Sequence, residues 1–175
     1  MKNKRIRGGY TLVELIIAVG LFALIMTLSS GAYLVMIGLN RQVQNISTGI
    51  NNLSFALESM VRDIRTGSVY NCGGIGDCSG GTTFSFKDSN GRVISYSLSG
   101  SALQRTIDGA TQILTDSSVT IDSLNFYAYG TRKPPGDYVQ ARVTVIVRGT
   151  VSAGEGKPKQ SFTVETGATM RGSDI

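Results

Sequence analysis

The 175-residue chain contains no histidine, and this absence removes several classes of catalytic site. Without an imidazole there is no Ser-His or Cys-His pair for nucleophilic catalysis. A zinc site of the usual kind would need two ligands beyond the two cysteines present. The glycine-rich stretch CGGIGDCSGG lacks the flanking strand, helix and lysine of a phosphate-binding loop. Nothing marks a serine–lysine dyad either, so we do not expect an enzyme.

Charge is almost absent from a long stretch near the N-terminus. Between Arg7 and Arg41 the only charged residue is Glu14. The stretch is apolar on all sides and long enough to span a hydrocarbon core of about 30 Å as a helix. An isolated carboxylate in such a span costs about 2 to 3 kcal/mol unless it is paired or reaches the interface. The position of Glu14 therefore needs an explanation.

A cut after Gly9 would supply a partner for Glu14. The cut frees the amino group of Tyr10, four residues before Glu14, and removes a leader that carries four basic residues. Of the 17 basic residues 13 then remain against 12 acidic ones, so the net charge of +5 reflects the leader. Basic residues that precede a span stay cytoplasmic. Everything after Leu39 is therefore expected outside the cytoplasm.

The residues around this cut resemble the processing signature of type IV pilins and type II secretion pseudopilins. The signature consists of Gly9, Tyr10, Thr11, Leu12, Val13, Glu14 and the apolar run that follows. The resemblance implies that a prepilin peptidase recognises Gly9, Thr11, Leu12 and Glu14, cleaves after Gly9 and methylates the amino group of Tyr10. It also implies that Glu14 neutralises the amine of a neighbouring subunit during assembly.

The same resemblance implies a set of partners and two successive locations. The partners are other pilin or pseudopilin subunits, the prepilin peptidase, an inner-membrane assembly platform and the lipid bilayer. The chain would first be a single-pass membrane protein with a cytoplasmic leader, and then a filament subunit. One alternative is a signal anchor whose Glu14 reaches the interface. A secretory signal peptide fits less well, because its small residues would follow the apolar run.

The chain is expected to be an α+β protein with the pilin fold and four segments. Residues 1–9 form the leader, 10–39 the transmembrane and filament-core helix, 40–67 its amphipathic second half, and 68–175 a globular antiparallel β domain. The second half is predicted from apolar residues spaced by three and four, which should face the domain. They are Val43, Ile46, Ile50, Leu53, Leu57, Met60 and Ile64.

The pattern changes to alternation after residue 81 and predicts strands at 82–87, 92–98, 102–107, 111–114, 119–129, 138–151 and 160–166. Residues 71–81 are predicted to form a loop. Asn90-Gly91 and Asp108-Gly109 are typical two-residue hairpin turns. Because the connections are short, the sheet should be an antiparallel meander. The strand with the clearest alternation should be central, with these residues against the helix: Val139, Ala141, Val143, Val145 and Val147.

The two cysteines, Cys72 and Cys78, lie in the part expected outside the cytoplasm. An oxidising compartment permits a disulfide that closes this short loop, and we favour that state. Two free thiols are the alternative.

Two binding functions have weaker support in the sequence. Some members of the family that this chain resembles bind calcium in sheet loops. Carboxylates occur in predicted loops here at Asp77, Asp88 and Asp137. None of them has EF-hand spacing, so we expect no cofactor and no metal. Some related subunits take up DNA, but the loop cations lack interleaved aromatic residues, so nucleic acid binding is not favoured. These cations are Arg132, Lys133, Lys157 and Lys159.

The function that we expect is that of a minor pilin or pseudopilin, with some likeness to J-type subunits in the segment MVRDIRTG. Its work would be to build a filament. The alternatives are a type II secretion pseudopilus tip subunit, a DNA-uptake or adhesin subunit at a pilus tip, and a simple membrane-tethered extracytoplasmic domain.

Overall fold

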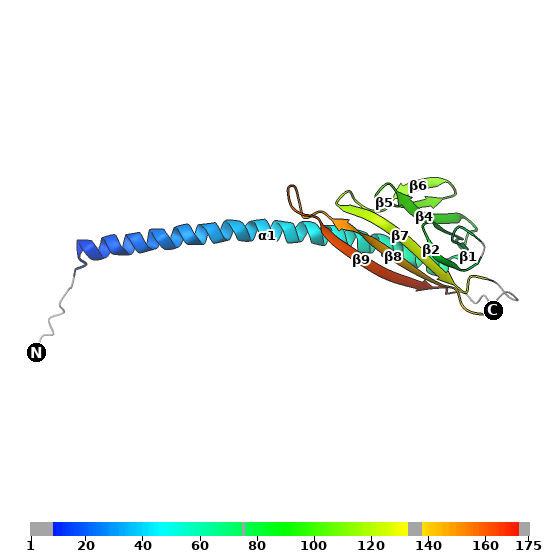
Figure 1. Ribbon diagram of the computed structural model, residues 1–175. Coiled ribbons are helices and arrows are strands. Elements are labelled where there is room, and N and C mark those ends of the chain that lie inside the picture. The colour runs from blue at the N-terminus through cyan, green and yellow to red at the C-terminus, as the bar shows by residue number, and fades with distance from the viewer. Residues whose placement is uncertain (1–8, 75, 133–137, 172–175) are drawn as a thin grey trace, which may run out of the picture. The chain divides into compact units, whose positions relative to one another are not determined.

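The computed structural model describes residues 9–74, 76–132 and 138–171. The chain divides into two compact units, Met1–Arg41 and Gln42–Ile175. One helix, α1 (Leu12–Thr66, 55 residues), contributes to both. The second unit contains all the strands, which gather along the C-terminal part of α1 (Figure 1).

The C-terminal part of α1 is amphipathic, as its spacing predicts. Leu53, Leu57, Met60 and Ile64 are buried, and Ile46 and Ile50 are partly buried against the same core. The first residue of the predicted stripe does not follow this pattern, because Val43 is 64% exposed. It lies close to the start of the second unit, before the helix reaches the sheets.

The helix ends at Thr66 for reasons that can be traced to single residues. The hydroxyl of Tyr70 donates to the carbonyl oxygens of Ile64 at 2.7 Å and Gly67 at 2.9 Å, and so occupies acceptors that the helix leaves free. A side chain at Gly67 would collide with the ring of Phe86, since a Cβ there would lie 2.4 Å from a ring carbon. Only glycine therefore fits at this exit.

The strands form two antiparallel sheets, which confirms the α+β arrangement and divides the expected meander in two. The first has the order β1-β3-β4-β5-β6, with β1 (Ser68–Asn71), β3 (Phe84–Lys87), β4 (Val93–Ser99), β5 (Ala102–Ile107) and β6 (Ala110–Ile113). The second has the order β2-β7-β8-β9, with β2 (Cys78–Gly81), β7 (Val119–Tyr129), β8 (Arg142–Val151) and β9 (Gln160–Thr169).

The prediction of a loop over 71–81 was wrong at both ends, because β1 and β2 enclose the cysteine loop. Both strands are four residues long and both pair with register shifts. The shortness and irregular pairing of both strands, and the two glycines of β2, hide them from a search for alternation. They form because each pairs with a neighbouring strand that is distant in the sequence, β1 with β3 and β2 with β7.

The two predicted glycine turns differ in form. Asp108 and Gly109 both have positive φ and join β5 to β6 as a two-residue turn. At the other hairpin only Gly91 has positive φ, and the loop begins at Asp88, whose N–H donates to the carbonyl of Arg92 at 3.0 Å. This connection is therefore longer than the predicted Asn90-Gly91 turn.

The valine-rich strand is central, as predicted. β8 lies between β7 and β9, and Ala141, Val143, Val145 and Val147 are buried. Val139 is 47% exposed and precedes the strand, so the prediction that it shares the buried face was wrong. The core of this unit also includes a group of packed rings, formed by Tyr70, Phe84, Phe86, Tyr96 and Phe126.

Candidate functional site

The residues that flank the predicted cut lie outside the helix and are exposed. Tyr10 is 87% exposed, and an atom added at the Cα of Gly9 would meet nothing within 4 Å. Both residues precede α1, which begins at Leu12. The peptide bond between Gly9 and Tyr10 is therefore not covered by any described part of the chain. These residues remain predicted processing residues.

Thr11 is the N-cap of α1. Its hydroxyl oxygen accepts a hydrogen bond from the backbone N–H of Glu14 at 3.3 Å, and its carbonyl accepts from Leu15 at 3.2 Å. Threonine is well suited to this position, because its oxygen satisfies an N–H that the first turn leaves free. The spacing of Thr11 and Glu14 is also that of a capping box. Together they fix the start of the helix close behind the predicted cut.

Glu14 lies in the first turn of α1 and is exposed. The positive end of the helix dipole stabilises a carboxylate here by about 0.3 to 1 kcal/mol. This is less than the cost of about 2 to 3 kcal/mol for a carboxylate within a membrane span. Among the described residues no basic side chain forms an ion pair with Glu14. Within the described part of the chain, the negative charge of Glu14 is therefore compensated only in part, by the helix dipole.

The apolar part of α1 buries none of its surface within its own unit. An 18-residue window has a mean hydropathy of 2.4 and is 0% buried, and by length and composition this helix can cross a membrane. Thr27 and Ser30 donate their hydroxyls to the helix's own carbonyls, at Leu24 and Met26, over 2.8 Å each. Their polar atoms are therefore satisfied without water.

Three glycines in this span are not required by contacts within the chain. A Cβ built at Gly20, Gly31 or Gly38 would meet nothing within 4 Å. Glycine in the interior of a helix costs about 1 kcal/mol relative to alanine. Small residues do allow other helices to approach closely in a membrane. Their presence fits a helix that packs against other helices.

Residues 4–30 match the prokaryotic N-terminal methylation motif. The chain carries the N-terminal signature of type IV pilin-like proteins. The matched segment includes the predicted cut, the cap at Thr11, Glu14 and the first part of the apolar span. It ends well before the sheets, and it does not distinguish a minor pilin from a pseudopilin. Comparison with curated proteins and with solved structures gave no match.

Cys72 and Cys78 form a disulfide, which confirms the favoured state over free thiols. Their Cα atoms are 5.9 Å apart, and the bond links the loop to β2. Gly81 lies against it, since a Cβ there would be 2.2 Å from the Cys72 sulfur. The bond therefore fixes the position of an edge strand that has only four residues.

The loop carboxylates considered for calcium are engaged in loop hydrogen bonds. Asp77 accepts from the backbone N–H and the hydroxyl of Thr131, at 3.0 and 3.1 Å. The Asp88 carboxylate accepts from Arg92 and Asn90, and these bonds outweigh the opposing effect of desolvation and lower its pKa. Asp137 lies outside the described residues. Within the described ranges no three His, Cys, Asp or Glu side chains gather as a metal site.

The cations considered for nucleic acid binding do not all fall in the described part of the chain. Lys133 lies outside it. Arg132 follows β7, whereas Lys157 and Lys159 lie in the connection between β8 and β9. Lys159 donates to the hydroxyl of Thr120 at 3.5 Å. The fold thus assigns these cations to two different connections.

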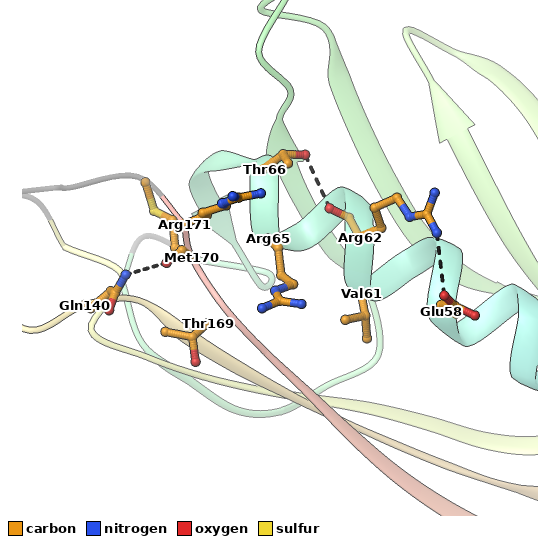
Figure 2. Close-up of a pocket in the computed structure, with 9 residues that line it drawn as sticks. All are labelled: Glu58, Val61, Arg62, Arg65, Thr66, Gln140, Thr169, Met170 and Arg171. Carbon is orange, nitrogen blue, oxygen red and sulfur yellow. Dashed lines mark hydrogen bonds and ion pairs between the residues drawn. The ribbon is translucent and has the colours of Figure 1, made fainter.

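Two features were missed from the sequence. The Thr11 cap was signalled by the spacing of threonine and glutamate before an apolar run. The second is a groove of about 780 Å³ in the Gln42–Ile175 unit, which has no local signal (Figure 2). Its lining comes from the end of α1, from Gln140 and from the end of β9, namely Glu58, Val61, Arg62, Arg65, Thr66, Gln140, Thr169, Met170 and Arg171.

Proposed function

We propose that the protein is a minor subunit of a type IV pilus-like filament, synthesised with a leader that is removed after Gly9. The new N-terminus, Tyr10, is methylated, and α1 then passes from the membrane into the filament. The observation that carries the proposal is the placement of Glu14. It is a carboxylate in the first turn of an apolar helix, within the matched methylation motif, and it has no ion-pair partner among the described residues.

Assembly follows from the energetics of this position. In the bilayer Glu14 remains uncompensated, because the helix dipole offsets only part of its cost. The amino group of Tyr10 in a neighbouring subunit supplies the missing charge. The apolar surfaces of the two helices exchange lipid for each other, and their glycines permit close approach. The charge pair thus sets the position of one helix along the other.

The partners follow from the same sequence of steps. A prepilin peptidase cuts and methylates the chain, the bilayer holds it, and an inner-membrane platform delivers it to the other subunits. The leader stays cytoplasmic and the unit with the sheets lies outside the cytoplasm. Its disulfide is consistent with this, since such bonds persist in oxidising compartments.

Variants at position 14 test the proposal in cells that express the filament system. We expect Glu14→Ala to be cleaved and held in the membrane but excluded from sheared filaments. Glu155→Ala is the control, because Glu155 is an exposed glutamate of the connection between β8 and β9 and does not line the groove. It should be incorporated normally. If Glu14→Ala enters filaments as well as the wild type, the proposal is wrong and a simple tethered domain is the better description.

A role in adhesion or DNA uptake at the filament tip is the second candidate. The observation that favours it is the disulfide-closed loop, which joins edge strands of the two sheets and exposes Gly73, Gly74 and Asp77. Changes in that loop should then remove attachment or uptake and leave assembly intact. If the protein is instead a subunit of a pseudopilus tip, the same changes should reduce secretion.

A further inference from the structure

Strand β9 has a free edge along its whole length. It is the last strand of its sheet and pairs only with β8, over ten residues without a register shift. The other three sheet edges of the described chain are strands of four residues, and two of these pair irregularly. Proteins normally block long edges with charges, proline or bulges. Of the ten residues in β9 only Glu165 is charged.

The hydrogen bond at the end of β9 shows which backbone groups face the free edge. The N–H of Met170 donates to the carbonyl of Ala141, in continuation of the β8 pairing, at 2.9 Å. Backbone groups alternate in direction along an antiparallel strand. The N–H groups of the odd-numbered residues of β9 therefore point away from β8. These residues are Ser161, Thr163, Glu165, Gly167 and Thr169, and all of them are exposed.

The large groove of the Gln42–Ile175 unit begins where this edge ends. Thr169 and Met170 form one side, and the last turns of α1 form the other (Figure 2). Val61 and Arg65 project from α1 into the space between them (Figure 2). On the face of β9 that packs against the core, Phe162 and Val164 are only partly buried. A strand added to β9 would thus find apolar surface along its inner face.

The groove carries an excess of positive charge. Arg62 forms an exposed ion pair with Glu58 at 3.5 Å. Arg65 and Arg171 form no ion pair among the described residues. The two are held close together, because the N–H of Arg171 donates to the carbonyl of Arg65 at 2.9 Å. Each guanidinium group can bind a carboxylate through paired hydrogen bonds.

We propose that β9 and the groove form a docking site for an extended segment of another polypeptide, which adds to the sheet as a further strand. The segment runs antiparallel to β9, as all neighbouring strands of this sheet do. Its inward residues are apolar, and its N-terminal end carries carboxylates that meet Arg65 and Arg171. Main-chain hydrogen bonds supply affinity, and the arginines set the register. The proposal does not depend on the function proposed above.

A synthetic peptide tests this with the full chain in detergent. The probe begins with two aspartates, continues with alternating valine and threonine, and carries a fluorescent label at its C-terminal end. The matched peptide begins with two asparagines instead. We expect saturable binding of the aspartate peptide by fluorescence anisotropy and about tenfold weaker binding of the asparagine peptide, because charge-assisted hydrogen bonds are lost. Equal affinities, or no binding of either peptide, would overturn the proposal.

Variants of the chain separate the edge from the groove. Thr163→Pro removes an N–H at the free edge and should weaken binding about tenfold or more while the fold is retained. Val164→Pro removes an N–H of the β8 pairing, and its lower melting temperature checks the assigned direction. If Thr163→Pro does not fold, Arg65→Gln with Arg171→Gln still tests the groove. This double variant should bind the aspartate peptide only as weakly as the wild type binds the asparagine peptide.

Arg148→Gln is the control, because Arg148 is an exposed arginine on β8 that does not line the groove. Binding that falls as much in this variant as in the groove variants would contradict the site. Self-association that Thr163→Pro abolishes, without peptide binding, would assign the edge to a second copy and overturn the peptide partner.

Discussion

The hydroxyl of Thr11 accepts a hydrogen bond from the backbone N–H of Glu14, over 3.3 Å. This contact begins α1 directly after the predicted cut and holds the carboxylate of Glu14 in the first turn. It gives Thr11 a physical role in addition to its predicted recognition by a peptidase. The helix would start less sharply without it.

The cap can be tested by replacing Thr11 with valine, which has the same shape but no hydroxyl. Loss of an N-cap costs about 1 kcal/mol, so the amide hydrogen of Glu14 should exchange about fivefold faster. Thr11→Ser keeps the oxygen and should exchange as the wild type does. Hydrogen exchange by NMR in micelles measures both variants. Equal exchange in valine and wild-type chains would show that the cap does not hold the helix start.

Two glycines in neighbouring strands should respond differently to alanine. A Cβ at Gly149 would lie 2.2 Å from the carbonyl oxygen of Thr120, whereas one at Gly167 would lie 3.5 Å from its nearest neighbour. Gly149→Ala should lower the free energy of unfolding by about 2 kcal/mol, because the backbone of β7 must move. Gly167→Ala should change it by less than about 0.5 kcal/mol. Chemical denaturation compares the two, and similar losses would contradict the close packing of β7 and β8.

Stability should fall at high pH because of Tyr96. Burial, together with its hydrogen bond of 2.6 Å to Asp63, raises the pKa of Tyr96 above its ordinary value of 10.0. Above about pH 10 the unfolded chain releases this proton and the folded chain keeps it, so the free energy of unfolding falls as pH rises. Tyr96→Phe should reduce that slope by about 0.7 kcal/mol per pH unit at pH 10, rising toward about 1.4 kcal/mol per pH unit at higher pH. Denaturation between pH 9 and pH 11 (about one unit either side of the ordinary pKa) measures it.

If the free energy of unfolding of Tyr96→Phe falls with pH as steeply as that of the wild type, groups other than Tyr96 cause the loss of stability at high pH. The partner of Tyr96 is itself paired, since Asp63 also binds Arg105 at 2.8 Å. Both side chains of that ion pair are about one fifth exposed (21% each). The phenylalanine variant leaves this ion pair in place, which makes it a cleaner test than a change at Asp63.

The disulfide should stabilise the unit that contains it by a modest amount. It closes a short loop, with a sequence separation of 6, and the chain-entropy model gives about 2 kcal/mol for a loop of this size. Replacing both Cys72 and Cys78 with serine should lower the free energy of unfolding by about that value. Gly81 contacts the Cys72 sulfur, so hydrogen exchange should increase first in β2. Exchange that rises first elsewhere would contradict the role of the bond at this edge.

The elements that carry a strong local pattern could be predicted from the sequence. The end of the helix was one, because its second half was predicted to stop at residue 67 and α1 ends at Thr66. The alternation of β8 and the Asp108-Gly109 turn were others. The prediction that the apolar stripe of the helix is buried was wrong only at Val43. The periodicity continues there, but the sheets do not cover this part of the helix. The prediction for β8 was wrong at Val139, because the alternation of residues does not show where the strand pairing ends. These are failures of boundaries, where tertiary contacts decide.

Features that depend on distant residues were not predictable. The division into two sheets depends on which strand lies beside which, and β1 and β2 exist only through such neighbours. The groove combines Arg65 near the middle of the chain with Arg171 near its end. The head of α1 was easier to interpret, because Gly9, Tyr10 and Glu14 lie within six residues.

The mass of the intact protein extracted from membranes tests the central claim most directly. The account predicts a chain that begins at Tyr10 and carries one added methyl group, with Gly9→Val leaving the leader attached as a control. A chain that begins at Met1 without methylation, in cells whose prepilin peptidase is active, would contradict it.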